Sequence, residues 1–161
     1  MNAEILGIDP NKIVACGASA GGYLSLCCAM IPGFDDYSDD LDIDCKPNAL
    51  VIFNGGVDSE LLIQLFPDLY MDLLIANPID AVKSNLPPSI FFHGTDDQNI
   101  PIRRITNFVE RLRLNGNECK LEVFEGMGHG FFNYGNHGNI PYLRTVEQTK
   151  CFLEDYCIFG E

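Results

Sequence analysis

A serine flanked by glycines separates two apolar segments near the start of the chain. Residues 12–26 read KIVACGASAGGYLSL, in which Ser19 stands in the pattern Gly17-x-Ser-x-Gly21. Such a turn between a strand and a helix holds the serine in a strained backbone conformation, and it needs small neighbours where the strand and the helix come close. A serine hydroxyl attacks a carbonyl only when a base removes its proton. Ser19 is therefore a candidate nucleophile that requires a histidine elsewhere in the chain.

Such a histidine, preceded by two acidic residues, follows later in the sequence. Asp96 and Asp97 occur in HGTDDQNIP, and His129 stands between two glycines in GMGHGFFN. Histidine accepts a proton near neutral pH, and a carboxylate behind it fixes its tautomer and stabilises the imidazolium. The backbone N–H of Ala20, at the start of the predicted helix, would stabilise the developing oxyanion. The order serine, acid, histidine indicates nucleophilic catalysis, with Asp96 and Asp97 as alternative acids.

The elements that must position these residues alternate between strands and helices. The pattern of apolar residues predicts strands at residues 13–16, 49–56, 89–94 and 119–124, and helices at residues 20–30, 61–65, 70–76, 102–114 and 141–156. This alternation is typical of parallel β-α units with right-handed crossovers, in which ligands bind beyond the carboxyl ends of the strands. We expect a single α/β domain over residues 1–161, with about four parallel strands, flanking helices and the candidate residues at one edge of the sheet.

The composition excludes several classes of function. The 161 residues carry a formal net charge of −13, which disfavours binding to nucleic acid or to anionic membranes. No signal peptide or apolar run of membrane-spanning length is visible, and seven cysteines without a zinc-type C-x-x-C spacing favour reduced, buried thiols in a cytoplasmic protein. The aspartate-rich segment 35–44 lacks the glycine and the closing glutamate of a calcium loop, so it predicts a solvated loop.

Three segments together resemble the α/β-hydrolases of the acetyl esterase, lipase and acetyl-xylan-esterase-like kind. They are DPNKIVACGASAGG, LPPSIFFHGTDDQNIP and FEGMGHGFFN, and the likeness covers nearly the whole chain. The resemblance implies that Ser19 is the nucleophile, that His129 is the base and that Ala20 N–H is an oxyanion donor. It also implies Asp97 as the acid, because Asp97 is the fourth residue after His93 in the family's His-Gly-x-x-Asp-x-x-x-Pro signature. No metal or organic cofactor is implied.

The remaining polar candidates have other expected roles. Asp96 is the competing acid, and it is otherwise expected to brace its turn. His93 is expected to be a structural histidine at the end of its strand, and His137 is expected at the surface or at a pocket rim. Asn54 and Asp58, near the end of the second strand, are further residues that can face the site.

The chain departs from the family pattern before the serine. The family has an upstream His-Gly-Gly-Gly type loop that supplies a second oxyanion donor, and residues 1–16 contain no counterpart. Losing one such donor typically costs about 10²–10³ in turnover. The elbow strand of the family is central, so the strand around Ile13–Cys16 becomes an apolar edge that invites pairing with another chain. We expect a homodimer there, with completion by a separate polypeptide or a truncated hydrolase as alternatives.

These observations predict a serine carboxylester hydrolase for short-chain acyl esters, with acetylated sugars as one substrate class. The alternatives are a serine peptidase related to prolyl oligopeptidases and a catalytically weakened hydrolase that serves as a binding or assembly protein. The segment 57–88 is expected to contribute to the pocket wall, and its candidate residues are Leu61, Leu62, Leu65, Phe66 and Tyr70.

Overall fold

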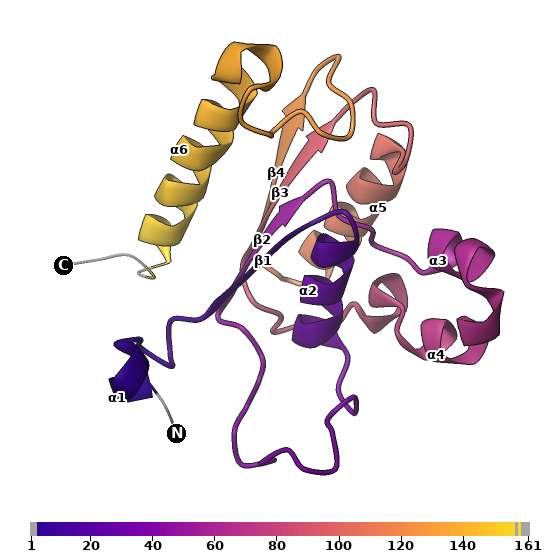
Figure 1. Ribbon diagram of the computed structural model, residues 1–161, viewed down its shortest axis with the longest axis vertical. Helices are drawn as coiled ribbons and strands as arrows, with labels where there is room; N and C mark the ends of the chain where they lie inside the picture. The colour runs from indigo at the N-terminus through magenta and orange to yellow at the C-terminus, as the bar shows by residue number, and fades with distance from the viewer. Residues whose placement is uncertain (1–2, 157, 159–161) are drawn as a thin grey trace.

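A four-stranded parallel sheet forms the centre of the molecule in the computed structural model, which describes residues 3–156 and 158. The strands are β1 (Val14–Ala18), β2 (Ala49–Phe53), β3 (Ser89–Gly94) and β4 (Cys119–Phe124), and they lie in the order β1-β2-β3-β4. Every neighbouring pair is parallel. The predicted α/β fold with four parallel strands is therefore confirmed, and the carboxyl ends of all four strands lie along one edge (Figure 1).

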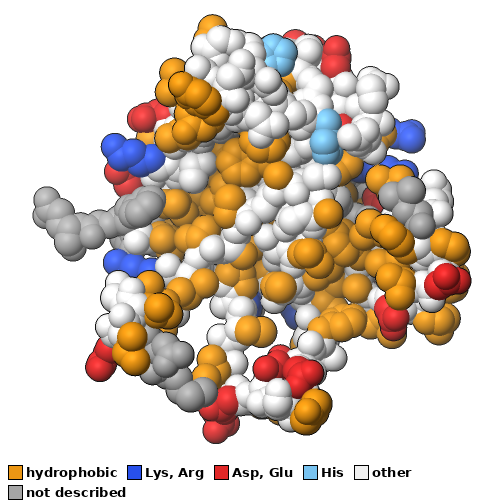
Figure 2. Space-filling model, viewed as in Figure 1, with side chains coloured by type: hydrophobic (Ala, Val, Ile, Leu, Met, Phe, Trp, Pro, Cys, Tyr) orange, Lys and Arg blue, Asp and Glu red, His pale blue; other side chains and the backbone are white. Residues whose placement is uncertain are grey.

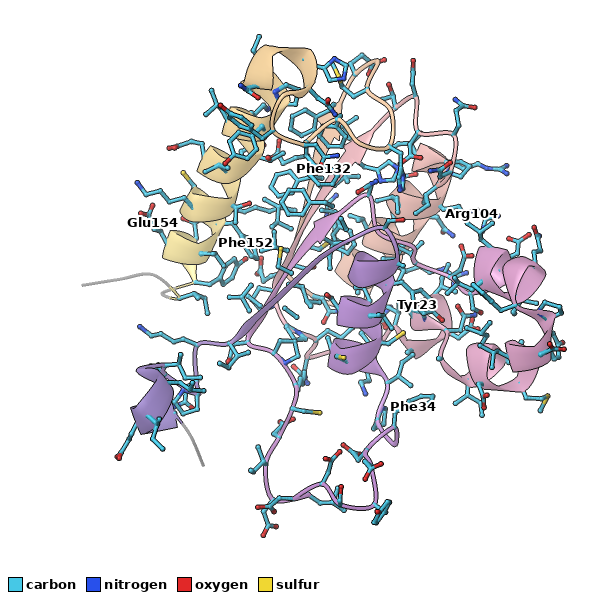
Figure 3. The ribbon with its side chains drawn as sticks, viewed as in Figure 1. Tyr23, Phe34, Arg104, Phe132, Phe152 and Glu154 are labelled. Carbon is cyan, nitrogen blue, oxygen red and sulfur yellow. The ribbon has the colours of Figure 1, made fainter. Side chains whose placement is uncertain are left out.

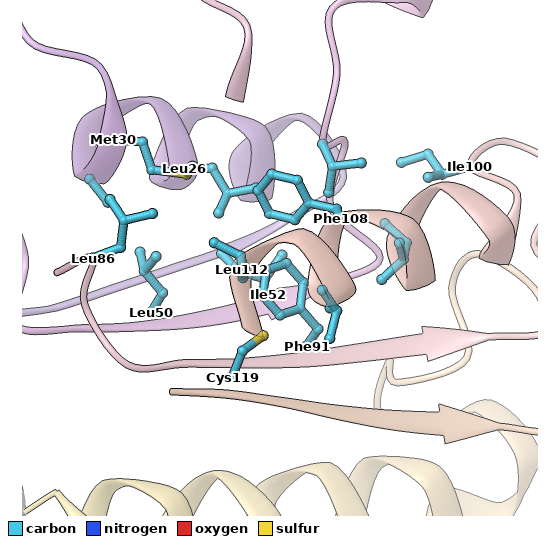
Figure 4. Close-up of a cluster of buried hydrophobic side chains, with 14 residues drawn as sticks. Leu26, Met30, Leu50, Ile52, Leu86, Phe91, Ile100, Phe108, Leu112 and Cys119 are labelled. Carbon is cyan, nitrogen blue, oxygen red and sulfur yellow. The ribbon is translucent and has the colours of Figure 1, made fainter. Parts of the chain in front are cut away.

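Helices cover both faces of this sheet. Two helices, α2 (Ala20–Met30) and α5 (Ile102–Leu114), pack on one face, and α6 (Ile140–Asp155) packs on the other (Figure 4). The shorter elements are α1 (Ala3–Leu6), α3 (Glu60–Leu65), η1 (Pro67–Leu69), α4 (Tyr70–Ile75), η2 (Pro78–Ala81) and η3 (Asn136–Asn139). Of these, α3 and α4 lie beyond α2, away from the sheet (Figure 1).

Two hydrophobic cores hold the layers together. The larger one lies between the sheet and helices α2 and α5, where Leu26, Ile52, Phe91 and Phe108 are essentially inaccessible to solvent (Figure 4). The smaller one joins the other face of the sheet to α6 through aromatic side chains that include Phe92 and Phe131. The apolar face of α5 faces the first core, as its helical spacing predicts. Both cores fix the strand ends that carry the candidate residues.

The cysteines differ from the sequence-based expectation. Cys119 is buried, but Cys16, Cys28, Cys45 and Cys151 are exposed. The exposed thiols lie on β1, on α2, on α6 and, for Cys45, directly after the aspartate-rich segment 35–44, at positions that no further layer covers. The expectation of uniformly buried thiols was therefore wrong for these four positions, and Cys157 lies outside the described residues. Over that described part, no helix is long and apolar enough to cross a membrane.

Strand β1 lies at one edge of the sheet and pairs with β2 alone among the described strands. Around it, Ile13, Cys16 and Leu24 are exposed. Figure 2 shows hydrophobic side chains over the middle of the face that is turned to the viewer. Figure 1, seen from the same side, places β1 there, between α6 and α2. An unpaired, apolar strand edge favours association with another chain. Pairing of two copies at this edge stays a prediction.

Candidate active site

The turn that carries Ser19 joins the end of β1 to the start of α2. Ser19 has φ 53° and ψ −117°, an unfavourable backbone conformation for a residue with a side chain. Its N–H donates to the Phe53 carbonyl at 3.0 Å, and its carbonyl accepts the N–H groups of Tyr23 at 3.1 Å and Gly56 at 3.3 Å. These bonds tie the turn to β2 and the loop after it. The surrounding backbone thus holds Ser19 in the strained conformation that the motif predicts.

The glycines around Ser19 contribute unequally to this close packing. A Cβ atom on Gly17 would lie 2.2 Å from the backbone carbon and oxygen of Gly21, whereas a Cβ on Gly21 would meet nothing within 4 Å. A Cβ on Gly22 would lie 2.8 Å from the Gly55 Cα. The expectation that Gly21 itself needs to be small was therefore wrong, because its missing side chain would point into open space. The close approaches require glycine at Gly17 and Gly22.

We predict that Gly17→Ala destabilises the protein and that Gly21→Ala does not. The added Cβ at Gly17 collides with backbone, so α2 must move away from β1, and overpacking of this kind costs about 3 kcal/mol. In a chain of this size that cost lowers Tm by roughly 10 °C. Gly21→Ala replaces a helical glycine where there is room, so its Tm is expected to be equal or higher. Thermal unfolding followed by circular dichroism measures both, and equal Tm values for the two variants would contradict this account.

Asp97 and His129 meet beyond the ends of β3 and β4. The Asp97 Oδ2 atom lies 2.8 Å from His129 Nδ1, so the neutral imidazole donates from Nδ1 and leaves Nε2 free to accept a proton. The Asp97 side chain is fully buried, and its Oδ1 accepts the backbone N–H groups of Asn99 at 2.9 Å and Ile100 at 3.0 Å. Asp96 is exposed, and among the residues that the structure describes its carboxylate accepts a hydrogen bond only from the neighbouring Thr95 hydroxyl, at 3.2 Å. The geometry thus separates the two candidate acids and places Asp97 behind the histidine.

The loop that presents His129 is held from three sides. The Asn54 side-chain amide, from the turn after β2, donates to the His129 carbonyl at 2.5 Å. A Cβ on Gly94 would lie 2.1 Å from the Met127 carbonyl oxygen, so glycine at the end of β3 is what lets this loop approach. Below the loop, the Phe131 ring is buried against Phe124 at a centroid distance of 4.6 Å. Asn54 is therefore a positioning residue for His129, a role that its sequence position alone did not require.

The other two histidines lie outside this arrangement. His93 is buried, its Nε2–H donates to the Ile100 carbonyl at 2.8 Å, and burial lowers its pKa, so it is neutral near pH 7. Its Nε2 lies 3.6 Å from Asp97 Oδ2, which is beyond hydrogen-bonding distance. This matches the structural role expected for His93. His137 is exposed in η3 and contributes nothing to the strand ends.

A cavity of about 320 Å³ opens beside Ser19 and Ala20. Leu61, Leu62 and Phe66 line it as expected, Tyr70 does not, and the Leu65 side chain lies outside the described residues. Sequence reasoning missed several further lining residues, among them Tyr23 and Arg104. Tyr23 donates its hydroxyl to the Ala76 carbonyl, and burial raises the pKa of its phenol. The remaining lining residues are Gly56, Val57, Asp58, Gln64, Asn99 and Ile100.

Ser19 follows β1, whereas Asp97 and His129 follow β3 and β4, which lie on the other side of β2 at the same edge of the sheet. The hydrogen bonds of these described residues do not include one between Ser19 Oγ and the His129 ring. Catalytic hydrogen bonds in unliganded sites are often long and tighten only when the substrate binds. A larger cavity of about 760 Å³ lies against α2 and the aspartate-rich segment 35–44, and Ser19, Asp97 and His129 are not among the residues that line it. Across residues 3–156 and 158, no cluster of three or more His, Cys, Asp or Glu side chains is arranged to hold a metal ion.

Comparison with known proteins places these features in a family. Residues 61–149, more than half of the chain, match the family model described as the prolyl oligopeptidase family. The chain is 30% identical over 153 residues to the esterase LipC of Mycobacterium tuberculosis. The matched region covers 81% of this chain and 37% of LipC. It is 27% identical over 145 residues to an acetylxylan esterase of Xylanibacter ruminicola, covering 81% of this chain and 28% of that enzyme.

Solved structures extend the likeness to nearly every residue of this chain. Esterase 2 of Thermogutta terrifontis, in its native form, matches with a TM-score of 0.90 and 36% identity, covering 99% of this chain and 60% of that one. The same esterase with propionate bound gives a TM-score of 0.88 and 36% identity, covering 99% of this chain and 61% of that one. Another of its structures is phosphoramylated by tabun, and it matches with a TM-score of 0.90 and 36% identity, covering 97% of this chain and 59% of that one. The chain therefore spans about three fifths of that solved esterase and about a third of the curated relatives that it matches.

Proposed function

The chain belongs to the prolyl oligopeptidase family and shares the α/β-hydrolase fold of esterases, and we propose that it is a serine carboxylester hydrolase for short acyl esters. In this proposal Ser19 is the nucleophile, His129 is the general base and Asp97 orients His129. The observation that carries the proposal is the 2.8 Å contact between Asp97 Oδ2 and His129 Nδ1, formed at the strand edge that also holds the strained Ser19 turn.

Each residue has a defined part in the proposed reaction. His129 Nε2 takes the proton of the Ser19 hydroxyl as Oγ attacks the ester carbonyl, and Asp97 stabilises the imidazolium that forms. Ala20 is the first residue of α2, so no intrahelical carbonyl can accept its N–H, and that donor is free to stabilise the oxyanion. His129 then protonates the leaving alcohol. Water, activated by the same histidine, attacks the acyl group on Ser19 and releases the acid.

Two observations support short acyl esters as the substrates. A cavity of about 320 Å³ lies at the lower end of the range for ligand pockets. The related Thermogutta esterase has been solved with propionate and with butyrate bound. The likeness to an acetylxylan esterase supports acetylated sugars as a narrower proposal within this class.

Peptide hydrolysis is the second candidate function, because the matching family model is that of the prolyl oligopeptidases. The same serine, acid and histidine would cleave either an amide or an ester. We favour ester hydrolysis, since the curated relatives and the solved neighbours that resemble the chain are described as esterases. Comparing p-nitrophenyl acetate with a proline-containing p-nitroanilide substrate separates the two functions.

A fluorophosphonate probe tests whether Ser19 is an activated nucleophile. We expect the native protein to be labelled once, and peptide mapping by mass spectrometry to place the adduct on Ser19. The heat-denatured protein is the control, because activation depends on the folded turn and on His129. Native protein that stays unlabelled, or that is labelled at another serine, would contradict the proposed nucleophile.

A further inference from the structure

The outer wall of the cavity beside Ser19 is a short helix with little anchoring of its own. Leu61 and Leu62 of α3, together with Phe66 just after it, line the cavity. Helix α3 packs chiefly against η1 and α4, which lie beyond α2 and away from the sheet (Figure 1). Leu61 and Phe66 are 41% and 52% exposed, so apolar burial alone holds this wall weakly. The distance of the wall from Ser19 must therefore be set by other contacts.

Arg104 supplies such a contact from a rigid element. It lies in the first turn of α5, next to Ile105, which is completely buried in the main core. Its Nη1 donates to Asp58 Oδ1 at 2.7 Å, and its Nη2 forms an ion pair with Glu60 Oε2 at 2.6 Å. Figure 3 shows Arg104 between α5 and α3. One guanidinium thus connects the core helix both to the segment that leads into α3 and to the first residue of α3.

The environment of these charges makes the connection effective. The Arg104 and Asp58 side chains are 27% and 17% exposed, so solvent screens this pair only partly. Glu60 is 62% exposed and contributes less by itself. Asp58 Oδ1 also accepts the Glu60 backbone N–H at 3.1 Å, so the three residues form one network. Two carboxylates already neutralise the guanidinium, which therefore offers no counter-ion to an anionic substrate.

We propose that Arg104 is a positioning residue for substrate specificity: it clamps Asp58 and Glu60, and thereby holds the α3 wall close to Ser19. The fixed wall limits the cavity to esters whose apolar group is short and uncharged. This proposal rests on the proposed esterase function, because it assigns the cavity to a part of the ester substrate. Loss of the clamp lets α3 move outward, and longer chains then fit better relative to short ones.

The kinetic test compares p-nitrophenyl hexanoate with p-nitrophenyl butyrate as substrates. We expect Arg104→Met, which keeps an unbranched side chain without the charge, to raise the hexanoate-to-butyrate ratio of kcat/KM about fivefold, mainly through KM for hexanoate. The double variant Asp58→Asn/Glu60→Gln removes the partners and keeps Arg104, so it should give the same shift. Arg103→Met changes the exposed neighbouring arginine and should leave the ratio unchanged. A ratio within twofold of the wild-type value in both clamp variants overturns the proposal.

A binding measurement separates this proposal from the proposed function. On a Ser19→Ala background, ligand-observed NMR titrations with methyl butyrate and methyl hexanoate give a ratio of Kd values without turnover. A fivefold shift toward hexanoate on Arg104→Met supports the clamp even if the wild-type protein hydrolyses no ester, a result that would count against the proposed function alone. Ester hydrolysis together with an unshifted Kd ratio overturns the clamp and leaves the proposed function standing. Failure of both methyl esters to bind also overturns the clamp.

Discussion

Replacing Ser19 with alanine is expected to abolish enzymatic p-nitrophenyl acetate hydrolysis, so that the ester is hydrolysed no faster with the variant than in buffer alone. Removal of the nucleophile from a complete serine triad costs about 10⁶ in kcat. A wild-type protein that lacks one oxyanion donor has a kcat about 10²–10³ lower than a complete triad enzyme. The ratio of wild-type to variant activity is then smaller by the same factor. In either case the variant should show no Ser19-dependent turnover, because no acyl-enzyme can form.

The fold should survive this substitution. The unusual backbone conformation at position 19 is held by the hydrogen bonds of its N–H to Phe53 and of its carbonyl to Tyr23 and Gly56, none of which involves the side chain. Alanine can make all three bonds, so circular dichroism and Tm should match those of the wild-type protein. A folded variant that keeps a tenth or more of the wild-type activity would show that another group is the nucleophile.

The sequence was sufficient to predict the four strands and the relative order of the chemical groups. Short apolar runs followed by glycine or polar residues mark parallel strands that are buried on both faces, and parallel topology brings their carboxyl ends to one edge. Ser19, Asp97 and His129 each follow such a run, so the approximate location of the site required no knowledge of side-chain contacts.

Contacts between distant segments were beyond sequence reasoning. Arg104 and Asp58 are separated by 46 residues, and the Asn54 amide and the His129 carbonyl by 75. Neither pair has a sequence spacing that indicates a contact, because each contact depends on where β2, β4 and α5 lie after packing. The two glycines of the motif give a similar result: only the three-dimensional crossing of β1 and α2 shows that Gly17 is crowded and Gly21 is not.

The Asp97→Asn variant is expected to lose about 10⁴ in kcat while keeping the geometry of the site. The reason lies in the two backbone N–H groups, of Asn99 and Ile100, that Asp97 Oδ1 accepts. They require an oxygen at that position, so an asparagine must place its NH₂ group at the position of Oδ2, facing His129. The amide then donates to His129 Nδ1, which forces the ring proton onto Nε2. In that tautomer Nε2 cannot accept the proton of Ser19.

Asp96→Asn is the matched control for this argument, since it makes the same chemical change one residue earlier, at an exposed side chain. We expect its kcat for p-nitrophenyl acetate to remain within about twofold of the wild-type value, and both variants to unfold as single cooperative transitions. A tautomer effect should also change the fluorophosphonate reaction, slowing it in Asp97→Asn and leaving it unaffected in Asp96→Asn. If Asp96→Asn were the slower variant in both assays, the acid would be Asp96, and the 2.8 Å contact between Asp97 and His129 would serve the loop structure instead of the chemistry.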